Sequence, residues 1–146
     1  MYDQILLPTD GSEGARAAVS EAIDLAEQHD ATLHLLYVVD TSAASGIPES
    51  HVSNLENLLE VAGERALSDV AEAASTRGID YQQTINRGPV HTAIIDYADA
   101  NDIDLIVMAT HGRSGIDRVL LGSVTERVIK QATPPVLVVR SRGQQG

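Results

Sequence analysis

The sequence contains no cysteine, no phenylalanine and no tryptophan. Without cysteine there are no disulfides, thiolate metal ligands or cysteine nucleophiles. Without the two large aromatics, Val, Ile, Leu and Ala must form the core. No apolar run approaches the roughly 18–20 residues of a membrane span, and the first residues lack the basic start and apolar stretch of a secretory signal. We therefore expect a cytoplasmic protein with no membrane partner.

Positive charge is also scarce, because ten Lys and Arg residues stand against 21 Asp and Glu, a net charge of −11. Such a field repels phosphate polymers, so we expect no nucleic-acid partner. Lys130 is the only lysine. An acidic, arginine-biased chain resembles proteins of salt-rich cytoplasm, where the Debye length falls to about 3 Å at 1 M salt. A halophilic source is a hypothesis that loss of folded signal on dialysis to low salt would support.

Short apolar runs alternate with segments of helical spacing along the 146 residues, a length typical of one domain. We expect a single domain, 1–146, with a polar tail from about 141. The alternation predicts a three-layer α/β fold with a mostly parallel sheet. Strands are predicted at 4–9, 33–39, 79–85, 105–109 and 136–139, and helices at 15–29, 52–78, 89–100 and 123–132.

Within the longest predicted helix the apolar residues alternate in steps of three and four, and Gly78 is expected to end it. This spacing predicts a core-facing stripe of Leu55, Leu59, Ala62, Ala66, Val70 and Ala73.

Two loops with unusual composition follow the first and fourth predicted strands. Pro8 cannot donate to a sheet, so it is expected where the first strand leaves the sheet. The loops read PTDGSEG at 8–14 and ATHGRSG at 109–115. In an open α/β sheet, ligands bind beyond the carboxyl ends of the strands. If the two strands are neighbours, the loops face each other across one crevice.

The segment from Ala109 to Glu126 carries the strongest functional signal. Gly112 and Gly122 bracket nine residues, and Ser123 follows at once. Glycine lets backbone amides approach a phosphate, and the helix that begins here adds free N–H groups and the positive end of its dipole. The hydroxyls of Ser123 and Thr125 are further candidate donors. A Walker sequence is absent, so no P-loop lysine is available.

The pieces ILLPTDGS, HGRSG, LLGSVTERVI and PVLVV occur in order, at 5–12, 111–115, 120–129 and 135–139. Together they resemble a single-domain universal stress protein of the ATP-binding type, over roughly residues 3–139. Nucleotide-binding members show G-x2-G-x9-G-[ST], and this chain has Ala at the first position of that pattern. The resemblance implies a five-stranded parallel sheet of order 3-2-1-4-5, Rossmann-like and of the adenine nucleotide alpha hydrolase type.

The resemblance also implies a site for ATP with Mg or Mn. In ATP-binding members the aspartate after the first strand lies near the phosphates and the metal, which corresponds to Asp10 here. Backbone groups at the end of the second strand hold the adenine, which corresponds to Val38. The full set of implied contacts is Pro8, Thr9, Asp10, Val38, Met108, Ala109, Gly112, Arg113, Gly122, Ser123, Val124 and Thr125.

Several of these residues have simpler explanations. Asp10 with Glu13, and Ser123 with Glu126, also fit helix-capping boxes. A methyl group at Ala109 is harmless in extended backbone but costs about 1 kcal/mol or more if φ is positive. The sequence leaves both questions open.

We expect an ATP-binding regulator of stress response or signalling, acting on an unknown downstream protein. Fast catalysis is not expected, because neither a positioned lysine nor a His–carboxylate pair is recognisable, and no catalytic residue is assigned. The strand 136–139 would lie at a sheet edge, and the family pairs this strand with its twin, which implies a homodimer. Loop 41–50 is expected to close over the ligand. The alternatives are a dimeric interaction module that binds no nucleotide and, as a third possibility, a slow ATPase or nucleotide hydrolase.

Overall fold

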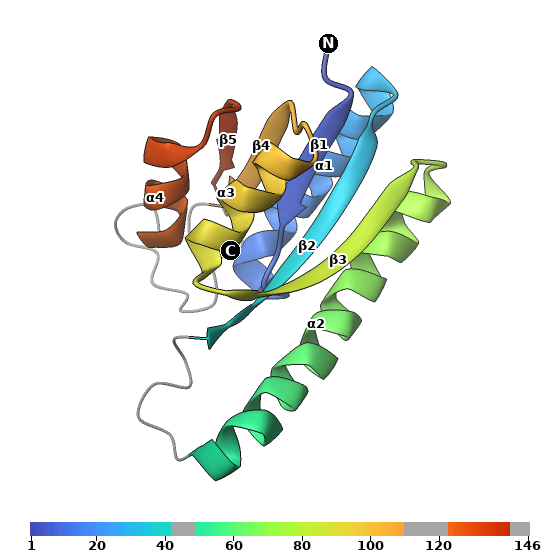
Figure 1. The fold of residues 1–146 in the computed structure, drawn as a ribbon. Coiled ribbons are helices and arrows are strands. Elements are labelled where there is room, and N and C mark those ends of the chain that lie inside the picture. Colours follow the sequence, from blue (N-terminus) through green and yellow to red (C-terminus); the bar gives the residue numbers. More distant parts are fainter. Residues whose placement is uncertain (42–48, 110–122, 141–146) are drawn as a thin grey trace.

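The computed structural model describes residues 1–41, 49–109 and 123–140. One parallel sheet has the order β3-β2-β1-β4-β5, which confirms the expected fold class (Figure 1). The predicted tail at 141–146 and most of the predicted covering loop lie outside the described residues. In chain order, the elements are β1 (Gln4–Pro8), η1 (Glu13–Ala15), α1 (Arg16–His29), β2 (Thr32–Asp40), α2 (Glu49–Thr76), β3 (Tyr81–Gly88), α3 (Val90–Ala100), β4 (Leu105–Ala109), α4 (Ser123–Gln131) and β5 (Val136–Val139).

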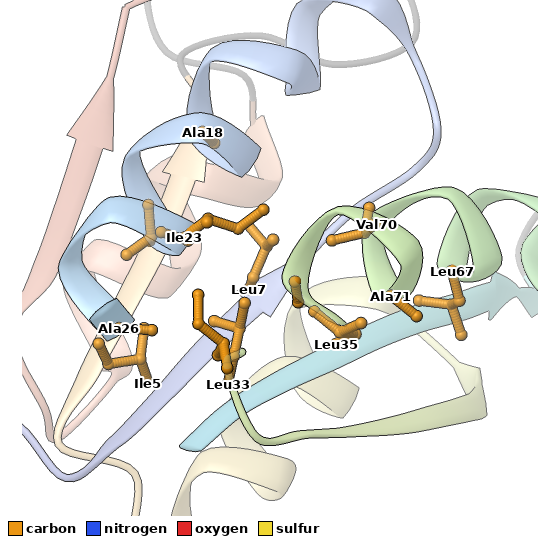
Figure 2. Close-up of a cluster of buried hydrophobic side chains, with 14 of the residues drawn as sticks. Ile5, Leu7, Ala18, Ile23, Ala26, Leu33, Leu35, Leu67, Val70 and Ala71 are labelled. Carbon is orange, nitrogen blue, oxygen red and sulfur yellow. The ribbon is translucent and has the colours of Figure 1, made fainter. Parts of the chain in front are cut away.

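Helices cover both faces of the sheet, α1 and α2 on one and α3 and α4 on the other (Figure 1). Successive strand residues point to opposite faces, so Ile5 and Leu7 of β1 join the cluster under α1 and α2, while Leu6 joins the other. Figure 2 shows the first cluster, where side chains of α1 and α2 point toward β1 and β2. The central strands β1 and β4 are almost entirely apolar because helices cover both of their faces.

The end of β1 is set by proline, as expected. Pro8 is the last residue of the strand and lies opposite Leu36 of β2. The next amide, that of Thr9, donates to the Leu36 carbonyl at 2.9 Å. The chain therefore leaves the sheet directly after this bond.

The third strand was predicted too early, at 79–85 instead of Tyr81–Gly88. Its last residues are polar, and Asn86 and Arg87 pair with Val38 and Val39 of β2. An edge strand has one neighbouring strand only, so its sequence need not be apolar. The prediction failed because it followed hydrophobicity alone.

The predicted core stripe of α2 is wrong in part. Ala62 and Ala73 are exposed, whereas Leu67, Ala71 and Ala74 are buried against the sheet. The prediction of its C-terminal end is confirmed: Gly78 has φ +72° and its amide donates to the Ser75 carbonyl at 3.0 Å. The helix therefore ends as predicted, but its core face is rotated around the axis.

The rotation of α2 has a specific cause at Gly63. This residue is buried against the ring of Tyr37, and a Cβ at this position would lie 2.5 Å from Tyr37 Cδ1. Only glycine permits this approach of helix to ring. The helix is thus oriented by a close contact to β2 that hydrophobic spacing does not reveal.

The first half of α2 extends past the sheet (Figure 1). Leu58 and Val61 are exposed there. Arg87 of β3 donates to Glu56 at 2.6 Å and to Glu60 at 3.1 Å. Among the described residues, none of the helices combines the length and hydropathy needed to cross a membrane.

Candidate functional site

A pocket of about 320 Å³ lies where β1, β2 and β4 reach their carboxyl ends. On β2, Leu36, Val38 and Asp40 follow one another at every second position and therefore share one face of the sheet. Leu36 belongs to the cluster under α3 and α4, and Val38 packs against it. The pocket is therefore on the α3–α4 side of the sheet, at the edge where α/β proteins bind ligands.

Apolar side chains form one wall of this pocket. Val90 and Ile94 are one helical turn apart on α3, and Met108 of β4 faces them from the sheet. With Leu36 and Val38 they form an apolar slot. Such a slot suits a flat, uncharged ring system, with polar groups elsewhere in the pocket to fix its orientation.

The turn after β1 supplies polar groups. Thr9 is 9% exposed, and its Oγ1 accepts the Gly11 amide at 3.2 Å. Asp10 Oδ1 accepts the Ser12 amide at 2.9 Å. The cap of α1 is Ala15, which makes no side-chain capping bond. The alternative of Asp10 as an N-cap of this helix is therefore wrong, because a 3-10 turn separates the aspartate from α1.

The start of α4 forms the opposite side. Ser123 is exposed and is the first residue of the helix. An N-cap precedes the first helical residue, so the alternative in which Ser123 is the N-cap of a capping box is wrong. The first amides of a helix have no acceptor within it and lie at the positive end of its dipole. Within the described part of the chain, the amides of Ser123, Val124 and Thr125 have no acceptor outside the helix either. Such amides are available to an anion.

Thr125 has a different role from the one expected of its hydroxyl. The side chain is 5% exposed, and Oγ1 donates to the Ala109 carbonyl at 3.2 Å. Its proton is therefore used to join α4 to the end of β4, and the expectation of a hydroxyl donor to phosphate is wrong. The bond fixes the start of α4 beside the strand end.

Ala109 resolves the question that the sequence left open. It is the last residue of β4 and pairs with Val139. Among the described residues, only Asp30 and Asp102 combine a side chain with positive φ. The backbone of Ala109 is therefore extended, and its methyl group packs against the cluster under α1 and α2. Alanine in place of the glycine of the family pattern introduces no backbone strain.

All of the predicted contacts that fall within the described residues line this one pocket. Gly112, Arg113 and Gly122 lie outside those residues. Strand periodicity extended from Val38 would have found the two further lining residues on β2, whereas those on η1 and α3 could be found only from the packing of these elements on the sheet. The lining residues not predicted are Ala15, Leu36, Asp40, Val90 and Ile94.

The acidic side chains of the pocket determine which kind of metal site it can form. Asp10 and Asp40 are the acidic residues that line the pocket, and among the described residues no group of three or more His, Cys, Asp or Glu is arranged to hold an ion. A site made of protein ligands alone therefore does not form in this part of the chain. Mg²⁺ commonly binds through one or two carboxylates and substrate phosphates, which Asp10 fits.

Comparison with known proteins identifies the family. The universal stress protein family matches residues 1–140. The chain belongs to this family. Universal stress protein MJ0531 of Methanocaldococcus jannaschii is 40% identical over 141 residues, covering 96% of this chain and 83% of that protein. The resemblance noted in the sequence is thereby confirmed.

Solved structures of universal stress proteins share the fold. The structure of protein MJ0577, also from M. jannaschii, superposes with a TM-score of 0.89 at 32% identity and covers 96% of each chain. A universal stress protein solved in complex with cAMP has a TM-score of 0.67 at 27% identity, covering 95% of this chain and 97% of its own. At least one relative of this chain thus binds an adenine nucleotide.

Proposed function

We propose that this protein binds ATP in the pocket on the α3–α4 side and serves as a nucleotide-dependent regulator of stress response or signalling. One observation carries the proposal: an apolar slot, a carboxylate and unpaired helix amides line a single pocket. A nucleotide needs these three features for its base, its cation and its phosphates, respectively. The relative in complex with cAMP supports the adenine base.

Each part of the nucleotide has a proposed set of residues. The base occupies the apolar slot beside the backbone of Val38, and the ribose lies near Met108 and Ala109. The amides of Ser123 to Thr125 bind phosphate. Asp10 holds a Mg²⁺ or Mn²⁺ ion that the phosphates also ligate, and this ion offsets the repulsion between two carboxylates and a polyanion.

The proposed role is binding rather than rapid turnover. Among the described lining residues, the titratable side chains are those of Asp10 and Asp40. Phosphoryl transfer depends on several cationic groups placed around the transferred phosphate. The binding reaction itself needs only the cation, the helix amides and the apolar slot.

We also propose that the protein is a homodimer. β5 lies at an edge of the sheet and its side chains are half-buried in the single chain. Among the described residues β4 is its only neighbouring strand, so the backbone groups on its other side suit pairing with a second copy. Light scattering at micromolar concentration is expected to give twice the mass of the chain, and a monomer would contradict the proposal.

The helix amides give a sharp test of nucleotide binding. Ser123→Asp places a negative charge at the start of α4, which favours the helix but repels a phosphate. We expect this variant to melt at or above the wild-type temperature while its affinity for Mg-ATP falls at least tenfold, measured by isothermal titration in high salt. Thr133→Asp is the control, because it adds the same charge at an exposed position after the helix.

The outcomes separate the proposal from its alternatives. Wild-type protein that gives no heat with Mg-ATP, AMP or cAMP, and no change in melting temperature, is the interaction module that binds no nucleotide. Steady release of ADP or AMP would identify a slow hydrolase. Equal affinity of Ser123→Asp and Thr133→Asp would exclude the start of α4 as the phosphate site.

A further inference from the structure

The turn between β1 and α1 lies between two hollows. Asp10 lines the nucleotide pocket, whereas Ser12 lines a second hollow of about 420 Å³ between α1 and α2. Thr9 and Ala15 line both. The turn is therefore a wall shared by the two, and a movement of its residues alters the nucleotide pocket directly.

The hydroxyl group of Ser12 has no partner. Its Oγ is buried, and no other buried side-chain nitrogen or oxygen of the described residues lacks a hydrogen bond. The backbone of Ser12 is fully used: the amide donates to Asp10 Oδ1 at 2.9 Å, and the carbonyl accepts the Ala15 amide at 3.1 Å. A buried hydroxyl without a partner costs free energy, and each such group in a folded protein needs an explanation.

Helix α2 limits how this turn can relax. Gly11 has φ +77°, and a Cβ on it would lie 3.0 Å from the Cβ of Ala66 on α2. Backbone and helix are therefore close on this side of the turn. On the other side of the turn, Asp10 borders the nucleotide pocket.

We propose that Ser12 is a positioning residue for the nucleotide pocket, whose hydroxyl is unpartnered in the turn seen here and gains a hydrogen bond when the turn adjusts to a bound nucleotide. The inference rests on the proposed function. A ligand shifts an equilibrium by its differential affinity for two states, and a group satisfied in one state alone favours that state. The Asp10 carboxylate, which already accepts the Ser12 amide, is the proposed acceptor of the hydroxyl in the adjusted turn.

The test combines stability and affinity in one variant. Ser12→Ala removes the unsatisfied hydroxyl, so we expect the nucleotide-free protein to melt about 3 °C higher. The same change removes the hydrogen bond proposed for the Ser12 hydroxyl in the nucleotide-bound protein. Mg-ATP should therefore bind about tenfold more weakly, as measured by isothermal titration. Ser20→Ala is the matched control, because Ser20 lines the same hollow but is exposed, and both of its values should equal those of the wild type.

A structural role alone would change the melting temperature and leave the affinity unaltered. A Ser12→Ala protein that melts below the wild type, or that binds Mg-ATP as tightly, therefore overturns the inference. If the wild type binds and Ser12→Ala binds equally, the proposed function stands and only the role of Ser12 is lost. A wild type that binds no nucleotide overturns both.

Discussion

The two faces of the sheet are built from alternate residues of the same strands but differ in what they enclose. Under α1 and α2, Ile5, Leu7 and Leu35 are fully buried in a continuous aliphatic cluster. The α3–α4 face has equally buried leucines but also contains the polar side chain of His34 and the candidate nucleotide pocket. A two-residue period thus lets one strand contribute to the aliphatic core under α1 and α2 on one side and to the candidate nucleotide pocket on the other.

Leu35 and Leu36 test the difference between the two faces most directly, because they are adjacent on β2, fully buried and on opposite faces. Leu35→Ala leaves a closed cavity and should lower the free energy of unfolding by about 3 kcal/mol. Leu36→Ala only widens a pocket and should cost about 2 kcal/mol, with several-fold weaker binding of Mg-ATP. Urea unfolding and calorimetric titration measure both. Weaker binding in Leu35→Ala alone would contradict the division between the faces.

Substitution of Gly63 tests how tightly α2 packs on its face of the sheet. Gly63→Ala brings a methyl group against the Tyr37 ring and should destabilise the protein by about 2 kcal/mol, as overpacking does. In a Tyr37→Leu background the ring is gone, and the same change should be neutral or favourable, because alanine is about 1 kcal/mol better than glycine within a helix. A double-mutant cycle by urea unfolding shows the coupling. Additive effects would mean that the ring does not orient α2.

The buried side chain of His34, on the α3–α4 face, predicts that the stability of the protein depends on pH. His34 is 3% exposed, its Nε2 lies 2.6 Å from Gln4 Oε1, and its Nδ1 lies 2.7 Å from the Tyr97 hydroxyl. An amide oxygen only accepts, so Nε2 donates to it. Burial lowers the pKa of His34 below the ordinary 6.5, which favours the neutral ring, and in the neutral ring Nδ1 accepts from the Tyr97 hydroxyl.

The sign of the effect follows from proton binding. As the pH falls below 6.5, His34 of the unfolded chain binds a proton before that of the folded protein does, so stability is lost. Urea unfolding at pH 7.5 and 5.5 should show a decrease that is smaller in His34→Gln than in the wild type. An equal decrease in both would assign the pH dependence to other groups.

The smallest expected effect concerns the half of α2 that extends past the sheet. Arg87 joins it to β3 through Glu56 and Glu60, and its side chain is 43% exposed. Arg87→Ala should change the free energy of unfolding by less than about 1 kcal/mol, since exposed ion pairs contribute little. Amide exchange over residues 54–60 should nevertheless become faster. Arg77→Ala, which instead removes ion pairs to Asp24 and Glu27 of α1, should leave that exchange unchanged.

Local chemistry made much of this fold predictable. Pro8 marked the end of β1, Gly78 the end of α2, and the apolar runs at 105–109 and 136–139 coincide with β4 and β5. The predicted contacts within the described residues also share one pocket, because the carboxyl ends of neighbouring parallel strands meet at one edge.

The remaining features depend on contacts between residues distant in sequence. The orientation of α2 is set by Gly63 against Tyr37, and hydrophobic spacing has no information on a ring some 26 positions away. The hydroxyl of Thr125 is bound by the Ala109 carbonyl, 16 residues earlier. The unpartnered hydroxyl of Ser12 is a property of burial in the assembled turn.

We propose that the α3–α4 side of the sheet binds an adenine nucleotide at the carboxyl edge of its strands. Amide NMR of the labelled wild-type protein, titrated with Mg-ATP in high salt, tests it residue by residue. We predict concentration-dependent shifts at Asp10, Val38, Met108 and Ser123 to Thr125, and unchanged amides at the opposite end of the strands. Saturating Mg-ATP that leaves those amides unmoved, or moves only residues over α1 and α2, would contradict it.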